Sequence, residues 1–194
     1  MNKKFELLLD DTITIFGIKL FRIKALISFG NVEEGEVGGY VEKETNLSSY
    51  GNAWVYGNAR VYGNARVSGD AEVSGDAWVS GDAEVSGDAR VYGNAWVHGN
   101  ARVYGNARVY GNAEVSGDAW VSGDADYIVF KNNWSSGRYF TYTKSNKMWK
   151  VGCFYGTGQE LIKKAYQDSE VSGKHYEAYV EFVEKLEKME EAND

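Results

Sequence analysis

Apolar and polar positions alternate in a six-residue unit that runs from residue 51 to residue 127. Each unit has the form Gly-Asn/Asp-Ala-x-Val-x and is repeated without an insertion. Alanine and valine stand at every second position, which is the period of a strand buried on one face. The Gly-Asn or Gly-Asp pair predicts a turn, because glycine enters positive φ freely and Asn or Asp tolerates it. A repeat this strict predicts a solenoid in which each unit covers its neighbour's apolar face.

Two inward side chains per short strand fit a triangular prism with three strands per turn. Such a prism has about 18 residues per coil, and its coils stack at roughly 4.8 Å. The twelve repeat valines from Val55 to Val121 then fill the tube. The sequence therefore predicts an all-β solenoid whose core needs no disulfide or metal.

The flanking segments predict caps at both ends. Residues 1–37 form an N-terminal β cap, in which Phe5 to Leu26 reads as short strands broken at 10–11 and 16–17. Residues 38–127 form the repeat domain, and its degenerate first coil places Val41 and Leu47 inward. Solenoids need such caps because their terminal apolar cross-section must be covered.

Residues 128–156 predict an antiparallel β-meander of three strands, and residues 157–194 predict a helical pair. The segment from Thr157 to Glu160 matches a capping box that opens the first helix. Ser172-Gly173 is expected to end it. The last helix, from Lys174 to about residue 192, carries an apolar stripe that must pack on the meander, the prism wall or another subunit.

Units of the form V-[YS]-G-[ND]-A-x resemble the hexapeptide repeat of left-handed β-helix proteins. That family includes trimeric acyltransferases and γ-class carbonic anhydrases. The flank at 21–55 and the motif GCFYGTGQE at 152–160 further resemble uncharacterised phage and prophage proteins that often carry a transferase label. The resemblance implies a left-handed parallel β-helix and a homotrimer.

Composition limits the environment and the partners. The net charge of the 194 residues is −7, which disfavours direct nucleic-acid binding through phosphate neutralisation. No apolar run approaches the roughly 20 residues of a membrane span, and the N-terminus lacks a signal-peptide core. We therefore expect a cytoplasmic protein without a membrane anchor. If a phage encodes it, the expected location is the cytoplasm of the host cell. The single cysteine, Cys153, is expected to pack in the core.

The outward positions carry the candidate binding residues. Residues 51–84 recur at 93–126 with four differences, at an offset of seven hexads that moves each copied residue to another face of a three-sided prism. Trp78 and Trp96 should stack on one face, between Arg60 and Glu114. That column is either a partly covered aromatic surface, an oligomer contact or a ligand-stacking site.

The acidic corners are expected to cluster over the middle coils; they are Asp70, Asp76, Asp82 and Asp88. Such a cluster is either a solvated patch, a mimic of nucleic acid or a docking surface for a basic partner. The candidate partner-binding residues are Arg60, Asp70, Asp76, Trp78, Asp82, Asp88, Tyr92, Trp96, His98 and Tyr110.

Candidate chemistry is sparse. The chain has two histidines, whereas the zinc site of a γ-class carbonic anhydrase takes three, so no metal site is expected. Resemblance to hexapeptide acyltransferases makes His98 the candidate base, with acyl-CoA bound between subunits. Its duplicated counterpart is Tyr56, which argues against catalysis.

We therefore expect a non-enzymatic, phage-type binding protein without a cofactor. It would engage a host protein and inhibit a nucleic-acid-directed defence enzyme through an acidic surface. The first alternative is an acyltransferase that uses acyl-CoA and His98. The second is a structural component that forms open-ended filaments.

Overall fold

The computed structural model describes residues 3–192, except for the side chain of Glu191. Over this range the chain divides into two compact units. The first unit runs to Tyr127 and includes Thr143–Asn146, and the second contains Ile128–Tyr142 and the chain from Lys147 onward. No helix of the described part is both long and apolar enough to cross a membrane.

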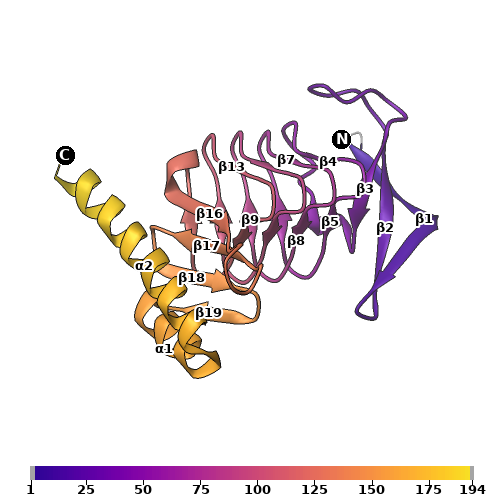
Figure 1. Ribbon diagram of the computed structural model, residues 1–194. Coiled ribbons are helices and arrows are strands. Elements are labelled where there is room, and N and C mark those ends of the chain that lie inside the picture. The colour runs from indigo at the N-terminus through magenta and orange to yellow at the C-terminus, as the bar shows by residue number, and fades with distance from the viewer. Residues whose placement is uncertain (1–2, 193–194) are drawn as a thin grey trace. The chain divides into compact units, whose positions relative to one another are not determined.

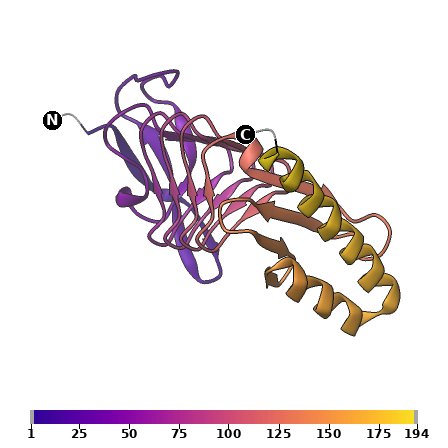
Figure 2. The same cartoon turned by 90° about the vertical axis from the view of Figure 1, so that its left-hand side faces the viewer.

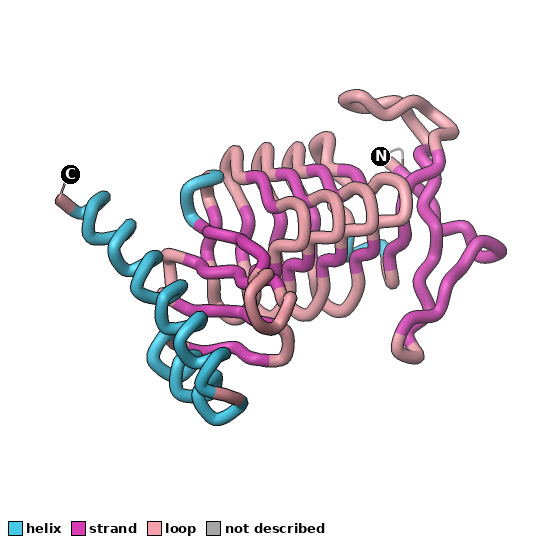
Figure 3. Tube along the Cα trace, viewed as in Figure 1, coloured by secondary structure: helices cyan, strands magenta, loops and turns pink. Residues whose placement is uncertain are grey.

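The hexads form a parallel β-helix (Figures 1 and 2). Within residues 3–192, one short strand arises from each hexad, and Figure 3 shows these strands as magenta segments between pink turns. Successive coils are 18 residues apart, so that Arg60 pairs with Trp78 and Trp54 pairs with Glu72. The three-sided prism is thereby confirmed. The strands are β4 (Trp54–Val55), β5 (Arg60–Val61), β6 (Arg66–Val67), β7 (Glu72–Val73), β8 (Trp78–Val79), β9 (Glu84–Val85), β10 (Arg90–Val91), β11 (Trp96–Val97), β12 (Arg102–Val103), β13 (Arg108–Val109), β14 (Glu114–Val115) and β15 (Trp120–Val121).

Each side of the prism is a parallel sheet within the first unit. The first sheet has the order β4-β7-β10-β13, and another has the order β6-β9-β12-β15. The remaining sheet continues through the cap, in the order β1-β2-β3-β5-β8-β11-β14. The repeat alanines and valines are buried inside the tube, as the alternation predicts.

The corners depend on glycine for two reasons. Gly69, for example, has φ 68°, and a Cβ added there would lie 2.9 Å from the backbone nitrogen of Gly87 in the next coil. At this corner, positive φ and close stacking both disfavour a larger residue.

The hydrogen bonds between coils have a direction. In each hexad that has a coil after it, the N–H groups of the two outward residues and of the corner Asn or Asp donate to that following coil. Arg60 N, for instance, donates to Ala77 O at 2.9 Å, and Asn64 N donates to Gly81 O at 2.7 Å. The corner and inward carbonyls of the first coil therefore face the N-terminal end and need donors from outside the repeat.

Lys4 supplies donors at the first corner. Its Nζ donates to Ala53 O at 2.8 Å and to Gly51 O at 3.0 Å. The side chain is buried, and burial lowers its pKa to about 8, although the charge of Asp70 opposes the shift. The buried ammonium group of Lys4 thus donates the hydrogen bonds that the backbone N–H groups of a preceding coil would otherwise donate.

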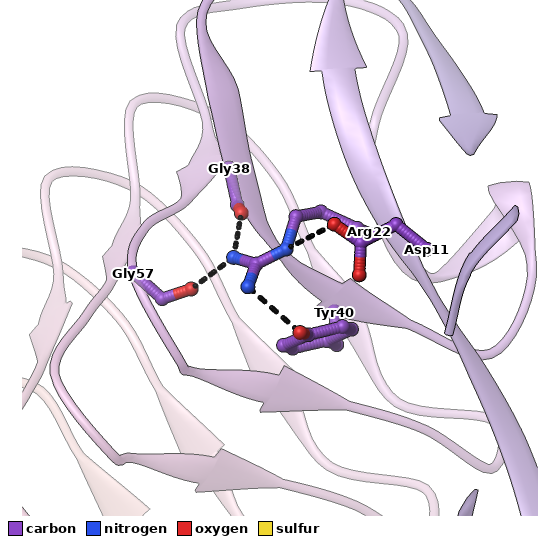
Figure 4. A network of polar contacts seen from close by, with 5 residues as sticks. All are labelled: Asp11, Arg22, Gly38, Tyr40 and Gly57. Atoms are coloured by element: carbon purple, nitrogen blue, oxygen red, sulfur yellow. Dashed lines mark hydrogen bonds and ion pairs between the residues drawn. The ribbon is translucent and has the colours of Figure 1, made fainter. Parts of the chain in front are cut away.

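Arg22 has the same role at the second corner, as Figure 4 shows. Its Nη1 donates to Gly57 O at 3.1 Å and to Gly38 O at 3.0 Å. Nη2 donates to the Tyr40 hydroxyl at 2.7 Å, and Nε forms an ion pair with Asp11 at 3.0 Å. The guanidinium therefore joins the cap to the first coil.

Asn46 completes the third corner. Its Nδ2 donates to Ala65 O at 2.8 Å and to Gly63 O at 3.2 Å, while its Oδ1 accepts from Lys43 N at 2.9 Å. The side chain is fully buried. Three side chains from three segments thus satisfy the corner carbonyls at the N-terminal end.

The C-terminal end needs acceptors instead, because outward N–H groups remain there. Asp124 Oδ1 accepts from Arg108 N at 2.9 Å, and Ser145 Oγ accepts from Trp120 N at 2.7 Å. The carboxylate of Asp126 accepts from the N–H groups of the last corner. Burial alone would raise the pKa of Asp126, but these hydrogen bonds hold it below its usual value.

The N-terminal cap is built on a hairpin. Its elements are β1 (Phe5–Ile15), β2 (Ile18–Ala25), β3 (Val37–Val41) and the 3₁₀ turn η1 (Glu44–Asn46). The expected turn at Phe16-Gly17 is confirmed, but the break at 10–11 is wrong, because β1 continues there with a register shift. Val41 pairs with Val61, and Leu47 bridges to Val67, so the degenerate first coil is confirmed.

The second unit is a β-sheet with two helices. Its sheet has the order β16-β17-β18-β19, in which β16 begins at the last residue of the first unit. The elements are β16 (Tyr127–Lys131), β17 (Tyr139–Thr143), β18 (Met148–Val151), β19 (Phe154–Gly156), α1 (Gly158–Asp168) and α2 (Glu170–Glu191); the turn η2 (Asp124–Asp126) precedes them. The sequence predicted three strands, but a turn at 152–153 divides the last run into β18 and β19. Cys153 lies in that turn and is exposed, so its expected core position is wrong.

The helices confirm one boundary and correct another. The capping box at Thr157 is present, since Glu160 N donates to Thr157 Oγ1 at 3.3 Å. The expected break at 172–173 is wrong, because α2 begins after its N-cap Ser169 and passes through Gly173. A Cβ at Gly173 would lie 2.3 Å from the Tyr166 ring of α1, so this glycine permits close helix packing.

Of the predicted stripe on α2, Tyr176, Val180 and Val183 are buried in one cluster with sheet residues. The meander is therefore the surface against which the stripe packs. Met189, near the end of the same helix, is exposed.

Candidate functional site

The predicted tryptophan column is present on the outer side of β5, β8, β11 and β14, which we call the Trp face. Register places Arg60, Trp78, Trp96 and Glu114 in consecutive coils. The Trp78 and Trp96 rings lie edge to face, with centroids 5.6 Å apart and planes at 64°. The Arg60 guanidinium lies 5.1 Å from the Trp78 ring centre, a cation–π contact.

The indoles form part of a small hollow. Its volume is about 310 Å³, and its lining residues are Arg60, Asp76, Trp78, Asn94 and Trp96. Trp96 Nε1 donates to Ser80 Oγ at 3.2 Å, which fixes this ring. The hollow therefore combines an apolar floor with charged and amide groups.

Phe16 also contacts this face, from the hairpin of the cap. Its ring meets Trp78 edge-on at 6.0 Å, yet the residue is 78% exposed. Phe16 has φ 49°, which is uncommon for a non-glycine residue. An exposed aromatic residue in a strained turn is a feature that the repeat pattern could not reveal.

His98 lies on the same face, two residues after Trp96 and just past the end of β11. Its Nε2 is 2.9 Å from Glu114 Oε1, and its ring centre is 4.8 Å from that of Trp96. A carboxylate that orients an imidazole is an arrangement that general bases use. The site thus brings His98 together with the tryptophan column.

A second aromatic group lies on the outer side of β7, β10 and β13, which we call the Tyr face. The Tyr92 and Tyr110 rings stack with centroids 5.4 Å apart and planes at 12°. Tyr110 is 47% exposed. Arg90 and Arg108 are exposed beside them, and Arg90 Nε lies 3.5 Å from a carboxylate oxygen of Glu72.

The four acidic corners do not form one surface, which corrects the expected cluster. Asp70 and Asp88 share one edge of the prism, since the Asp70 N–H donates to the corner carbonyl of the next coil. Asp76 and Asp82 lie on the two other edges. Two corners share an edge only when they are a multiple of 18 residues apart, whereas neighbouring corners are six apart. On the third edge the carboxylate of Asp82 accepts a hydrogen bond from Asn64 Nδ2 at 3.1 Å.

The third side of the prism carries a groove that the sequence did not predict. Its volume is about 680 Å³, and its lining includes Ser48, Ser49, Tyr50, Arg66 and Glu84. It arises where η1 and the following serines replace the regular hexad of the first coil. The departure from the repeat at residues 44–50 is the signal that could have located it.

No three His, Cys, Asp or Glu side chains gather as metal ligands within residues 3–192.

Comparison with known proteins supports the repeat architecture. A family model described as the YdcK beta solenoid repeat matches residues 53–69, 59–75, 65–81, 83–99 and 101–123. No curated protein matches the chain. The matched segments coincide with the coils of the observed β-helix.

Proposed function

We propose that this β-solenoid repeat protein is a non-enzymatic binding protein that engages a host protein through its Tyr face. The observation that carries the proposal is the stacked Tyr92–Tyr110 pair, flanked by exposed Arg90 and Arg108. Tyrosine and arginine are among the residues that dominate the energy of protein interfaces. The Trp face is a weaker candidate for a protein, because its indoles are half-buried.

The scaffold favours tight recognition. Strand β10 pairs with β7 on one side and with β13 on the other, so the backbone beneath Tyr92 and Arg90 is held from both sides. The two tyrosine rings are already stacked before any partner arrives. Binding therefore loses little conformational entropy at this surface.

The host partner is suggested by the resemblance to phage and prophage proteins. A single acidic docking surface is not part of this proposal, because the four corner aspartates lie on three edges. Asp70 and Asp88 lie on an edge that borders the Tyr face, so they remain candidates for contacts at its rim. Such rim charges would make association depend on salt.

The test is a capture experiment from host lysate with quantitative mass spectrometry. The variant carries Tyr92→Ala and Tyr110→Ala together, and the matched control is Tyr104→Ala, an outward tyrosine on the third side of the prism. We expect a host protein that is retained by the unaltered chain and by the control but lost by the double variant. Equal retention by all three proteins would refute the proposal.

A second candidate function is acyl transfer, which the His98–Glu114 contact favours. Glu114 would orient the imidazole, and His98 would accept the proton of the acyl acceptor, with acyl-CoA bound at a subunit boundary of a trimer. The substitution His98→Tyr is the suitable test, since Tyr56 occupies the equivalent slot in the duplicated segment. Turnover of acetyl-CoA that disappears in this variant would establish the enzyme and overturn the non-enzymatic proposal.

A further inference from the structure

The hollow on the Trp face is separate from the Tyr face and has its own chemistry. Its floor is apolar, because Trp78 and Trp96 contribute two indole rings at 64° to one another. Its volume of about 310 Å³ is at the small end of the range for small-molecule sites. The hollow thus suits one compact ring.

The polar groups of the hollow have opposite charges that do not neutralise each other. Arg60 and Asp76 both line it, yet neither side chain forms an ion pair within residues 3–192. Arg60 Nε is buried and has no hydrogen-bond partner among the described residues. A ligand in the hollow cannot reach this buried atom, but it can accept from the outer Nη groups of the half-buried guanidinium, which form no ion pair within the described residues.

The combination of these charges discriminates between ligands. A cationic ligand would face Arg60, and an anionic ligand would face Asp76. A neutral ligand that carries both donors and acceptors can satisfy both side chains and the amide of Asn94. A sugar ring has this property, because the hydroxyl groups on its adjacent carbons both donate and accept hydrogen bonds. The C–H face of the same ring can pack on an indole.

From this arrangement we infer that the Trp face binds an uncharged hexopyranose, as a free sugar or as one residue of a glycan. The sugar ring lies against the indoles of Trp78 and Trp96. Arg60 donates to its hydroxyl oxygens, and Asp76 accepts from its hydroxyl groups. This inference is independent of the protein partner proposed for the Tyr face.

The test uses the full chain and saturation-transfer NMR with methyl glucopyranoside, methyl galactopyranoside and methyl mannopyranoside. We expect at least one of them to bind with a dissociation constant on the order of 1 mM, typical of a shallow single-sugar site. Glucosamine, which is positively charged, and glucuronate, which is negatively charged, should both bind at least about tenfold more weakly than the tightest-binding of the three neutral pyranosides.

Matched variants assign the site. Trp96→Ala should abolish the signal, whereas Trp120→Ala should retain it. Trp120 is an outward tryptophan on another side of the prism, and Arg102 lies 5.8 Å from its ring centre, so the control removes a similar Arg–Trp pair. Arg60→Gln provides a second variant that leaves both indoles in place, and it should weaken binding at least about tenfold.

Three results would overturn the inference. One is that none of the neutral hexopyranosides binds. Another is that Trp96→Ala and Arg60→Gln, each folded as judged by circular dichroism, both bind as well as Trp120→Ala does. The last is that a charged sugar binds more tightly than each of the three neutral pyranosides.

Discussion

The direction of the hydrogen bonds between coils can be tested at Asn46. The substitution Asn46→Asp keeps the size of the side chain and its acceptor for Lys43 N, but it removes both donors. The carbonyls of Ala65 and Gly63 then lose hydrogen bonds of 2.8 and 3.2 Å and face a carboxylate instead. The expected effect is a large loss of stability, although Asn and Asp replace each other at other corners of this chain.

The magnitude follows from the burial of this corner. A buried carbonyl left without a donor costs about 1–3 kcal/mol, and one of the two bonds is fully buried. With the repulsion between carboxylate and carbonyl added, we expect a decrease of about 3 kcal/mol in the free energy of unfolding, or roughly 6–12 °C in Tm. Protonation gives the carboxyl one donor, so acidification below its raised pKa should recover part of the loss.

The assay is urea unfolding followed by circular dichroism, with Asn112→Asp as the matched control. Residue 112 is an exposed corner whose counterpart in the duplicated segment is Asp70, so the control should lie within about 0.5 kcal/mol of the unaltered chain. If Asn46→Asp proves as stable as the control at neutral pH, the assignment of Asn46 as a donor cap is wrong.

Three further predictions concern other parts of the fold. Because the pKa of Lys4 is about 8 in the folded chain and 10.5 in its ordinary state, the unfolded chain holds this proton more tightly between these values. The contribution of Lys4 to the free energy of unfolding should therefore rise from about pH 8 to pH 10.5. The measurement is the difference in the free energy of urea unfolding between the unaltered chain and Lys4→Met across this pH range. Phe16→Asn should raise the unfolding free energy by about 1 kcal/mol, because Asn accepts the positive φ of a two-residue hairpin turn; an unchanged Tm would contradict this. Gly173→Ala should lower the melting temperature of the helical unit despite better helix propensity, since its Cβ would meet the Tyr166 ring at 2.3 Å.

The regular part of the fold follows from the sequence because its interactions are periodic. In each hexad the alternating alanine and valine predict the strand, the Gly-Asn or Gly-Asp pair predicts the corner, and three hexads give the spacing of 18 residues between stacked positions. The Trp78–Trp96 column followed from this spacing alone. The same arithmetic contradicts the expected acidic cluster, since corners six residues apart lie on different edges.

The contacts that attach the caps could not be predicted, because they join segments without a shared period. Lys4 and Ala53 are 49 residues apart in the chain, and nothing in the N-terminal sequence distinguishes Lys4 from its exposed neighbour Lys3. Trp54 is another example. The repeat pattern places its side chain on the outer surface of the tube, but Phe5 and Phe29 cover it, so that it is fully buried.

The site was only partly predictable for a related reason. The sequence placed Arg60 beside Trp78, but the hollow also depends on Asp76 and Asn94, which belong to a corner and not to a strand. The arrangement of a corner side chain relative to a strand side chain depends on rotamers that a repeat pattern does not specify.

The 18-residue register gives changes in repeat number two distinct physical meanings. Insertion of three hexads would lengthen the β-helix by one coil and leave every downstream side chain pointing in its original direction. Insertion of a single hexad would instead rotate the downstream coils by a third of a turn about the axis of the β-helix. A change of three hexads therefore alters only the length of the β-helix, whereas a change of one hexad alters both its length and the direction of the downstream side chains.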